Sequence, residues 1–438
     1  MHPSRRNFLN TAGSAIVYQL AGNGPTMRAA GVNDQVGLGF IGSGIRGTQL
    51  IDDFKSIPGL RMLAVCDLYD GCLQRAKEQI SPGIQTGKDY RGVLDRKDVD
   101  AVVIATPDHL HKRMVLDALQ AGKHVYIEKP MTWSLEEGPE IIAAAKSAER
   151  IVQVGSQGKT SMLTAKAREL IQSGALGKVN MIRMANHRNN AQGAWRYAVP
   201  PDASPRTIDW NRFLGQRPAR AFNADVFFRW RCWWEFSGGV ATDLFVHLLT
   251  WLHEVMNVKA PVSVVSQGGL HKWTDGRDVP DVMNSVFEYQ EGFLVDMYVN
   301  LCNGRQLQGP VLHGIEGTLA EDRGRLILWK EPVDNDVQGY GTLQWPREMR
   351  ARYFEERGYT REGRPRQPSP PVEPQEVAIE RGPSHAEYFI LSIRNNTPSK
   401  ETAEEGHYAA GAAHLANMAF RQGARMKWDW SSNKAAAA

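Results

Sequence analysis

Two short stretches, far apart in the chain, carry residue types that could exchange protons with a substrate. The first is the turn Glu128-Lys129-Pro130, which follows a buried-strand-like run over residues 124–127, and the second contains Asp243 and His247. Lysine and histidine can hold or release a proton near neutral pH when their surroundings shift their pKa values. If the fold brings the two stretches together, the sequence predicts a site for general acid–base chemistry.

Asp243 and His247 lie one helical turn apart in a predicted helix over residues 240–256, so their side chains share one face. Removing a hydride from a hydroxyl-bearing carbon requires a base for the hydroxyl proton, and a neutral imidazole suits that task. The same spacing also fits a hydrogen-bonded pair that only supports the helix, or two metal ligands, although no third ligand stands out. For Lys129 the alternative is a solvated salt bridge at the end of a strand.

A glycine-rich turn follows the apolar residues 36–41 and could hold a cofactor. It consists of Gly42, Ser43, Gly44, Ile45, Arg46 and Gly47, and an amphipathic stretch up to residue 55 comes after it. The first glycine permits a tight turn, the second lets the backbone approach a pyrophosphate, and the third allows a helix to pack on the strand. Free N–H groups at the helix start would bind the phosphates. Taken alone, the motif also fits a turn without a ligand.

Asp67 indicates which cofactor this turn would hold. It ends a second predicted strand over residues 61–66, about 20 residues after the last glycine, where dinucleotide-binding folds place a carboxylate on the adenosine ribose. Facing a ribose 2′-phosphate at about 4 Å, that carboxylate would cost roughly 1–4 kcal/mol. Leu68 adds no compensating positive charge, so the sequence predicts NAD rather than NADP.

Strands and helices alternate through the first part of the chain. Further strands are predicted over residues 101–105, 124–127 and 151–154, with helices over 109–121 and 134–147. Strands separated by helices of this length form a parallel, doubly wound sheet, whose ligand crevice lies at the carboxyl ends of the strands. Beside the glycine turn, the cofactor-binding residues predicted at that edge are Thr106, Pro107, His109, Glu128, Lys129 and, after the last strand, Gln157.

Together these motifs give the chain a resemblance to a known family, the Gfo/Idh/MocA oxidoreductases. The resemblance rests on the glycine turn, on Asp67, on the Thr-Pro turn with His109, and on the Glu-Lys-Pro turn, and it covers residues 36–430. It implies an N-terminal Rossmann domain and a C-terminal α+β domain with a large open, mostly antiparallel sheet. It also implies that this sheet pairs with a second subunit in a homo-oligomer.

The resemblance further assigns roles to particular residues. It implies that Lys129 is catalytic and that the peptide before Pro130 is cis. In the family, a glycine pair followed by D-x-x-x-H places an aspartate and a histidine opposite the nicotinamide, and Asp243 and His247 match those positions. Lys129 nearby would disfavour an imidazolium and keep His247 neutral, while Asp243 would orient the ring or bind a second hydroxyl.

The expected domain boundaries follow from these motifs and from composition. They are a leader over residues 1–31, a cofactor domain over 32–155, a substrate domain over 156–430, a surface insertion with little regular structure over 338–374, and a tail outside the fold over 431–438. Alternating segments between residues 261 and 328 predict antiparallel strands. Helices are expected over residues 385–393 and 404–423.

An aromatic and basic segment over residues 195–234 is the predicted substrate contact. Flat aromatic faces with interleaved guanidinium groups suit the C–H faces and hydroxyls of a sugar. The candidate substrate-binding residues are His187, Trp195, Arg196, Arg229 and Trp230. The alternative is that these aromatic side chains form core and a subunit contact.

Composition and the N-terminus limit the class of protein. With 438 residues and a net charge of +4 from interspersed acids and bases, the chain shows no basic arm for nucleic acid. Its 4 cysteines form no CxxC pair, so free thiols are expected, and no stretch is apolar and long enough to span a membrane. Ser4-Arg5-Arg6-Asn7-Phe8-Leu9 resembles the twin-arginine export motif and predicts a periplasmic or exported protein.

The function that these observations favour is hydride transfer between a sugar or glycoside hydroxyl carbon, with C3 as one candidate, and tightly bound NAD. An exported enzyme has no free nicotinamide pool, so its cofactor should stay bound and return to its starting state in each turnover. One alternative is an NAD-dependent glycosidase, in which transient oxidation of C3 leads to elimination and hydration. The other is a cofactor-binding protein without catalysis.

Overall fold

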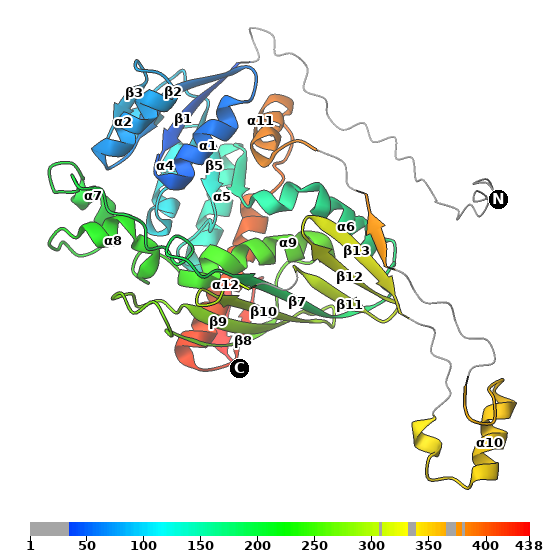
Figure 1. Ribbon diagram of the computed structural model, residues 1–438. Helices are drawn as coiled ribbons and strands as arrows, with labels where there is room; N and C mark the ends of the chain where they lie inside the picture. The colour runs from blue at the N-terminus through cyan, green and yellow to red at the C-terminus, as the bar shows by residue number, and fades with distance from the viewer. Residues whose placement is uncertain (1–34, 306–308, 332–338, 365–373, 379–381) are drawn as a thin grey trace, which may run out of the picture.

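The computed structural model describes residues 35–305, 309–331, 339–364, 374–378 and 382–438. The predicted leader lies outside these residues. Two sheets organise the described chain, one of six strands and one of ten. Figure 1 shows the first at the blue and cyan end of the chain and the second, green to yellow, below it.

The first sheet is parallel and has the strand order β3-β2-β1-β4-β5-β6. Its strands are β1 Val36–Ile41, β2 Leu60–Cys66, β3 Gln85–Gly87, β4 Ala101–Ile104, β5 His124–Glu128 and β6 Val152–Gly155. Its main helices are α1 Ile45–Lys55, α2 Asp70–Gln79, α3 Arg91–Leu94, α4 His111–Gln120 and α5 Gly138–Ala148. Strand order reverses at β1, where such folds bind their ligands. The predicted doubly wound sheet is confirmed.

The burial of the central strands explains why the chain adopts this fold. Every residue of β1 and of β4 is buried. Continuous apolar runs of this kind are typical of parallel strands covered by helices on both faces. One face packs against α1 and the other against α4 and α5. The carboxyl ends of β1, β2, β4 and β5 therefore share one edge of the sheet.

The second sheet is mixed, with the order β14-β13-β12-β11-β7-β10-β9-β8-β15-β16. β7 and β10 run parallel and the other neighbours run antiparallel. Its strands are β7 Val179–His187, β8 Ser263–Gly269, β9 Val282–Glu288, β10 Leu294–Asn300, β11 Val311–Gly314, β12 Gly317–Asp322, β13 Arg325–Lys330, β14 Gln375–Val377, β15 Met426–Asp429 and β16 Lys434–Ala437.

Three helices cover the inner face of this second sheet and form the largest core with it. They are α6 Met162–Gln172, α9 Val246–Met256 and α12 Ala403–Gln422. The remaining α-helices of the described residues are α7 Trp210–Leu214, α8 Ala224–Phe228, α10 Arg347–Glu356 and α11 His385–Asn395. In the described ranges no helix is both long and apolar enough to cross a bilayer.

Three expectations about the C-terminal part need correction. The tail expected outside the fold contains β16, which pairs with β15. The insertion over 338–374, expected to have little regular structure, contains α10, which stands apart from both sheets in Figure 1. Helix α11, expected in the substrate domain, packs on the first domain, where Phe389 contacts the rings of Phe54 and Tyr126 at centroid distances of 6.2 and 5.7 Å. Amphipathic patterns predict helices but do not identify the sheet that each helix covers.

Candidate active site

The two stretches predicted to carry the chemistry meet at the boundary between the domains. Lys129 follows β5 directly, and its peptide bond with Pro130 is cis. The Lys129 ammonium donates to Oδ1 of Asp243 at 2.9 Å and to the Asp243 backbone carbonyl at 2.8 Å. The two side chains are only 10% and 13% exposed. An ion pair thus joins the first sheet to the helix of the second domain.

Asp243 accepts hydrogen bonds on both carboxylate oxygens. Arg231 Nε donates to Oδ1 at 3.1 Å, and the indole N–H of Trp195 donates to Oδ2 at 3.1 Å. Burial acts to raise the pKa of Asp243, but Lys129 and Arg231 outweigh it and hold the pKa well below its usual range. Asp243 therefore stays ionised. Its structural effect is to position the Lys129 ammonium.

His247 is held in its neutral form. Burial and, to a smaller extent, the charge of Lys129 lower the pKa of His247 to about 3, against the opposing effect of Asp243. A neutral imidazole can accept a proton from a hydroxyl group at any ordinary working pH. The predicted influence of Lys129 on His247 is present, but burial is the larger cause.

The backbone that carries Asp243 is not the regular helix predicted over residues 240–256. Residues Ala241–Phe245 form a π-helical turn, and α9 begins only at Val246. Such turns are rare and are found frequently at functional sites. The close-packed pair Gly238-Gly239, with φ +59° at Gly239, precedes the turn. A Cβ on Gly238 would lie 2.4 Å from the Thr242 side chain, so glycine is required there.

A buried histidine supports the turn that presents Lys129. The ring nitrogens of His111 lie 2.8 Å from the Pro130 carbonyl and 2.9 Å from the Thr106 carbonyl. The ring is fully buried. His111 thereby connects the ends of β4 and β5. Thr106 and Pro107, predicted to bind cofactor, belong to the turn that it holds.

Three residues predicted to bind cofactor form one network. Arg46 Nε donates to Oε1 of Glu128 at 2.9 Å, and the Gln157 amide donates to the same oxygen at 2.8 Å. The Gln157 amide also donates to the Tyr126 hydroxyl at 2.9 Å. This network connects the glycine turn to the Lys129 turn. The second terminal nitrogen of Arg46 is buried without a partner in the described chain, so one donor is available to a ligand.

The glycine turn has the shape that a dinucleotide needs. Gly42 has φ +90°, and a Cβ on Gly47 would lie 2.1 Å from the Gly42 carbonyl oxygen, so both positions require glycine. A Cβ on Gly44 would meet no atom within 4 Å, which leaves open space beside the turn. No side chain caps the first N–H groups of α1. The residues present therefore fit the pyrophosphate of NAD.

Asp67 lies beside this turn at the end of β2. Its Oδ2 accepts a hydrogen bond from the Ser43 N–H at 2.7 Å, and its Oδ1 accepts one from the Tyr69 N–H at 3.0 Å. Burial raises the pKa of Asp67, although these backbone N–H groups oppose the shift. The position is the one in which a carboxylate would hold the adenosine ribose hydroxyls.

A segment of the second domain crosses over the first domain at this point; we call residues 202–228 the clasp. The Tyr69 hydroxyl donates to Oδ1 of Asp202 at 2.5 Å, and the Asp209 N–H donates to the Leu68 carbonyl at 2.9 Å. Tyr69 also forms a β-bridge with Ile208. The clasp is thus fixed to the residues that follow Asp67.

The clasp gives His109 different surroundings from those expected of a cofactor ligand. Its Nε2 lies 2.6 Å from the Phe213 carbonyl oxygen, and its ring packs edge-on against Phe213 and Phe236. Most aromatic side chains of the segment predicted to contact sugar belong to the small core around them: Trp210, Phe213, Phe236 and, at its edge, Phe222, Phe227, Trp230 and Trp233. The alternative interpretation, core packing, therefore describes these side chains.

The predicted substrate-binding residues are spread around the site. Trp195 is corrected to a support for Asp243, because it is 1% exposed and has a left-handed backbone with φ +62°. Arg196 pairs with Asp275 at 3.4 Å, and Arg229 pairs with Asp225 at 2.5 Å. Trp230 lies under the Arg231 guanidinium at 4.2 Å, and the His187 ring packs edge-on against Tyr298.

Four residues near Asp243 were not predicted: Asp108, Arg188, Tyr197 and Arg231. Asp108 is 3% exposed, and burial together with Asp243 raises its pKa to about 8, against Arg231 and Lys129. Burial also raises the pKa of the Tyr197 phenol, while Arg231 and Arg188 oppose the rise. The alternating basic and aromatic residues at 229–234 were a signal for Arg231. Tyr197 belongs to the same predicted aromatic and basic segment, and Asp108 belongs to the predicted turn with Thr106 and His109. Nothing in the sequence distinguishes Arg188.

No group of three or more histidine, cysteine or acidic side chains is arranged to hold a metal ion in the described part of the chain. The four cysteines are free thiols there.

Two family descriptions match the chain over most of its length. Residues 36–156 match "Oxidoreductase family, NAD-binding Rossmann fold", and residues 168–427 match "Oxidoreductase family, C-terminal alpha/beta domain". The predicted NAD-binding domain is confirmed by the first of these matches.

Individual relatives match more restricted parts or at lower identity. A glycosyl hydrolase family 109 protein of Shewanella baltica is 32% identical over 172 residues, which cover 33% of this chain and 38% of the relative. An alpha-N-acetylgalactosaminidase of Shewanella oneidensis is 36% identical over 123 residues, covering 26% of this chain and 27% of the relative. The chain thus spans well under half the length of these relatives.

Solved structures share the fold at low identity. Levoglucosan dehydrogenase, in complex with NADH and levoglucosan, has a TM-score of 0.65 and 16% identity, covering 89% of this chain and 98% of that chain. Aldose-aldose oxidoreductase of Caulobacter crescentus has a TM-score of 0.64 and 18% identity, covering 90% of this chain and 99% of that chain.

Proposed function

The chain belongs to the Gfo/Idh/MocA oxidoreductase family, and on that premise we propose that it transfers a hydride between a hydroxyl-bearing carbon of a sugar or glycoside and bound NAD. NAD would supply the hydride acceptor. The observation that carries the proposal is the Lys129–Asp243 ion pair at the domain boundary, with a neutral His247 on the next helical turn.

Each residue of this constellation has a distinct task. His247 accepts the hydroxyl proton of the substrate, because its imidazole is neutral and half-buried. The Lys129 ammonium donates a hydrogen bond to the same oxygen and stabilises negative charge that develops on it. Asp243 is a weak base, since Lys129 and Arg231 hold its pKa well below its usual range and both of its oxygens accept hydrogen bonds. It fixes the direction of the ammonium.

We also propose that NAD stays bound between turnovers. The clasp closes over the residues after Asp67 with hydrogen bonds, a β-bridge and an edge-on contact between Tyr69 and Phe228 at 5.3 Å. Release of the cofactor would then require these contacts to open. A resident cofactor suits an enzyme that oxidises one sugar and reduces another, and it suits the exported protein that the twin-arginine-like motif at residues 4–9 predicts.

The second candidate is an NAD-dependent glycosidase. The names of the Shewanella relatives, a glycosyl hydrolase family 109 protein and an alpha-N-acetylgalactosaminidase, favour it. Transient oxidation of C3 would acidify the C2 proton and allow the glycosidic bond to break by elimination. Water would then add, and the hydride would return from the reduced cofactor to C3. The same lysine and histidine would serve the oxidation step. The constellation therefore supports both candidates, and the products distinguish them.

One experiment separates these candidates. The purified protein, without added or removed cofactor, is incubated with neutral and acidic sugars and their glycosides, while bound-cofactor absorbance and product NMR are recorded together. A ketosugar with reduced cofactor indicates the dehydrogenase; free sugar without accumulated reduced cofactor indicates the glycosidase. A non-catalytic cofactor-binding protein would give neither product, and that result would overturn the proposed function.

The subunit arrangement is part of the proposal. We expect a homo-oligomer in which the outer face of the ten-stranded sheet pairs with a second copy. Large apolar side chains on or beside that face are exposed: Met181, Val265, Leu294 and Ile315. Light scattering of the wild type and of Leu294→Lys tests this, since a charge in the interface should shift the mass toward the monomer.

A further inference from the structure

The group of side chains around Lys129 carries more positive than negative charge. Lys129 Nζ and Arg231 Nε both bind Oδ1 of Asp243, at 2.9 and 3.1 Å. The single negative charge of Asp243 thus balances only one of the two positive charges that bind it. The Arg231 side chain is 23% exposed, and its guanidinium lies over the Trp230 ring at 4.2 Å. Charges that are half removed from water are costly unless a partner compensates them.

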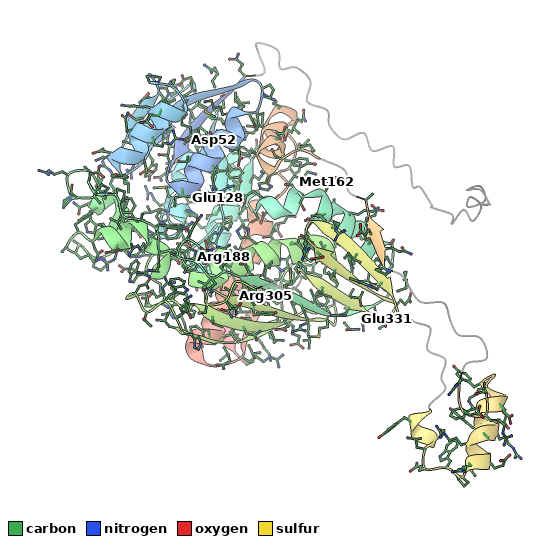
Figure 2. All side chains as sticks on the ribbon, viewed as in Figure 1. Asp52, Glu128, Met162, Arg188, Arg305 and Glu331 are labelled. Carbon is green, nitrogen blue, oxygen red and sulfur yellow. The ribbon has the colours of Figure 1, made fainter. Side chains whose placement is uncertain are left out.

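Arg188 adds a third cation to this group. It follows β7 directly, and its Nε donates to the neutral amide oxygen of Asn186 at 3.2 Å. No carboxylate of the described residues forms an ion pair with it. Side chains alternate along a strand, so Arg188 continues the face of β7 that carries the buried Ile182 and Met184. After burial and Lys129, its charge is one of the influences on the pKa values of Asp243 and His247. In Figure 2 Arg188 lies near the boundary between the two domains, below the label of Glu128.

The position of the Arg188 side chain is constrained by packing. A Cβ on Gly193 would lie 2.9 Å from Cβ and 3.1 Å from Cδ of Arg188, so the aliphatic stem lies directly on the backbone of that glycine. The Arg188 N–H donates to the Asn300 carbonyl at 2.9 Å, which fixes the backbone against β10. The guanidinium is therefore presented by a supported stem, and a ligand that binds it loses little side-chain freedom.

The other acidic side chains nearby do not cancel the excess. Glu128 is paired with Arg46 at 2.9 Å. Asp108 is buried beside Gly238, and burial raises its pKa to about 8, which favours its uncharged form near neutral pH. The phosphates of a dinucleotide would be held at the glycine turn and the start of α1, not by Arg188 or Arg231. Two positive charges thus remain for the substrate.

We propose that the substrate carries a carboxylate, as a uronic acid or a glycoside of one does, and that Arg188 binds this group with Arg231 beside it. The inference rests on the proposed function, because it specifies the sugar that the same site oxidises. Guanidinium groups match planar carboxylates with two parallel hydrogen bonds.

The test compares two ligands that differ only in this group, methyl glucuronide and methyl glucoside, or the galacto pair. Binding to the cofactor-loaded protein is measured by calorimetry at low and high salt, and kcat/KM is measured for the same pair. The wild type should bind the uronide more tightly, with a preference that salt reduces. Arg188→Met should weaken uronide binding roughly tenfold to a hundredfold, the effect of a lost charge-assisted hydrogen bond. Binding of the neutral glycoside should change little.

Arg183→Met is the matched control, because Arg183 lies on the same strand and pairs with Asp296 at 3.3 Å on the exposed face. It should leave both ligands unaffected. Arg188→Lys keeps the positive charge but loses the paired N–H donors of the guanidinium. It should retain part of the preference for the uronide that Arg188→Met loses. Equal or better binding of the neutral glycoside by the wild type would overturn the inference while leaving the proposed function intact.

Two further outcomes are decisive. A sugar phosphate that binds more tightly than the uronide, with the same dependence on Arg188, would overturn the carboxylate assignment. Uronide binding that depends on Arg188, without oxidation of any sugar, would support the inference and overturn the proposed function. The two claims therefore fail in distinguishable ways.

Discussion

The two ends of the crevice along the first sheet are built differently. At the Asp67 end, the clasp from the second domain closes over the chain with hydrogen bonds, a β-bridge and packed aromatic rings. At the Lys129 end, two cations converge on Asp243, and a third, Arg188, forms no ion pair with any carboxylate in the described part of the chain.

This difference indicates that one end of the crevice retains the cofactor and the other carries out the reaction. Contacts that are satisfied within the protein, as around Tyr69, hold a bound group in place but do little chemistry. Groups that lack a full partner, as around Lys129, are available to a substrate. Perturbed pKa values and unpaired charge concentrate at functional sites for the same reason. The contrast predicts that substitutions at the Lys129 end change the rate, whereas substitutions at the Asp67 end change cofactor retention.

The largest effect is expected from removing the proposed base. His247→Ala should lower kcat roughly a hundredfold to ten-thousandfold, because no other neutral base has been placed beside Lys129. Cofactor content should remain unchanged. Steady-state kinetics and absorbance of the bound cofactor measure both. His253→Gln is the control, since His253 lies on the same helix and contacts the Tyr289 hydroxyl at 2.9 Å; an equal loss in both variants would contradict the role of His247.

A smaller loss of rate is expected when the support of Asp243 is weakened. Trp195→Phe removes the indole N–H that donates to Asp243, and hydrogen bonds to charged groups are worth roughly 1.5–3 kcal/mol. We expect kcat to fall about tenfold to a hundredfold with little change in KM. Trp210→Phe removes an indole bond to a backbone carbonyl in the clasp region and should leave kcat nearly intact. A change confined to KM would assign Trp195 to substrate binding instead.

Substitution at the other end should alter retention and spare the rate. Tyr69→Phe removes the hydroxyl that binds Asp202, and one such bond is worth roughly 0.5–1.5 kcal/mol. NAD should dissociate about twofold to tenfold faster during dilution, followed by fluorescence, while kcat at saturating NAD stays constant. Tyr90→Phe is matched to it, because the Tyr90 hydroxyl binds Asp117 at the same distance of 2.5 Å within the first domain. Equal rates of NAD dissociation from both variants would contradict the proposal that the clasp retains the cofactor.

The smallest expected effect is a dependence of uronide affinity on pH, which tests whether positive charge near Lys129 binds the substrate. Asp108 is protonated below its pKa of about 8 and ionises as the pH rises through that value. Ionisation adds a negative charge near Arg231, Lys129 and Asp243, so uronide affinity should fall roughly twofold to threefold, the effect of one charge at about 8 Å in a water-like dielectric. Calorimetry between pH 6 and 9 measures it. Asp108→Asn should abolish the fall; persistence of the fall in that variant would assign it to another group.

Local motifs predicted the first domain well, because its signals lie within a few residues of one another. The strand over Val36–Ile41, the glycine turn and Asp67 were all identified from spacing. Lys129 and Asp243 are 114 residues apart, so no local pattern predicts their contact. The family resemblance predicted it.

The remaining parts of the site depend on contacts between distant segments, which no local pattern encodes. Trp195 is of a residue type that often binds sugars. Its backbone is left-handed, and its side chain is buried beside Asp243. The π-helical turn at Ala241–Phe245 follows from the packing of Gly238 and Gly239. Arg188 looks like any surface arginine in sequence; only the fold shows that no acid pairs with it among the described residues.

The central claim is that Lys129 and His247 act on one carbon whose hydride leaves to the bound cofactor. It is tested most directly with a sugar deuterated at the oxidised carbon, incubated in one turnover with the cofactor-loaded protein, followed by mass spectrometry of the extracted cofactor. We predict that the deuterium appears on the nicotinamide ring in the wild type, with a primary isotope effect on its rate, and that transfer is nearly lost in Lys129→Met. Turnover of the sugar without deuterium in the cofactor would contradict the account.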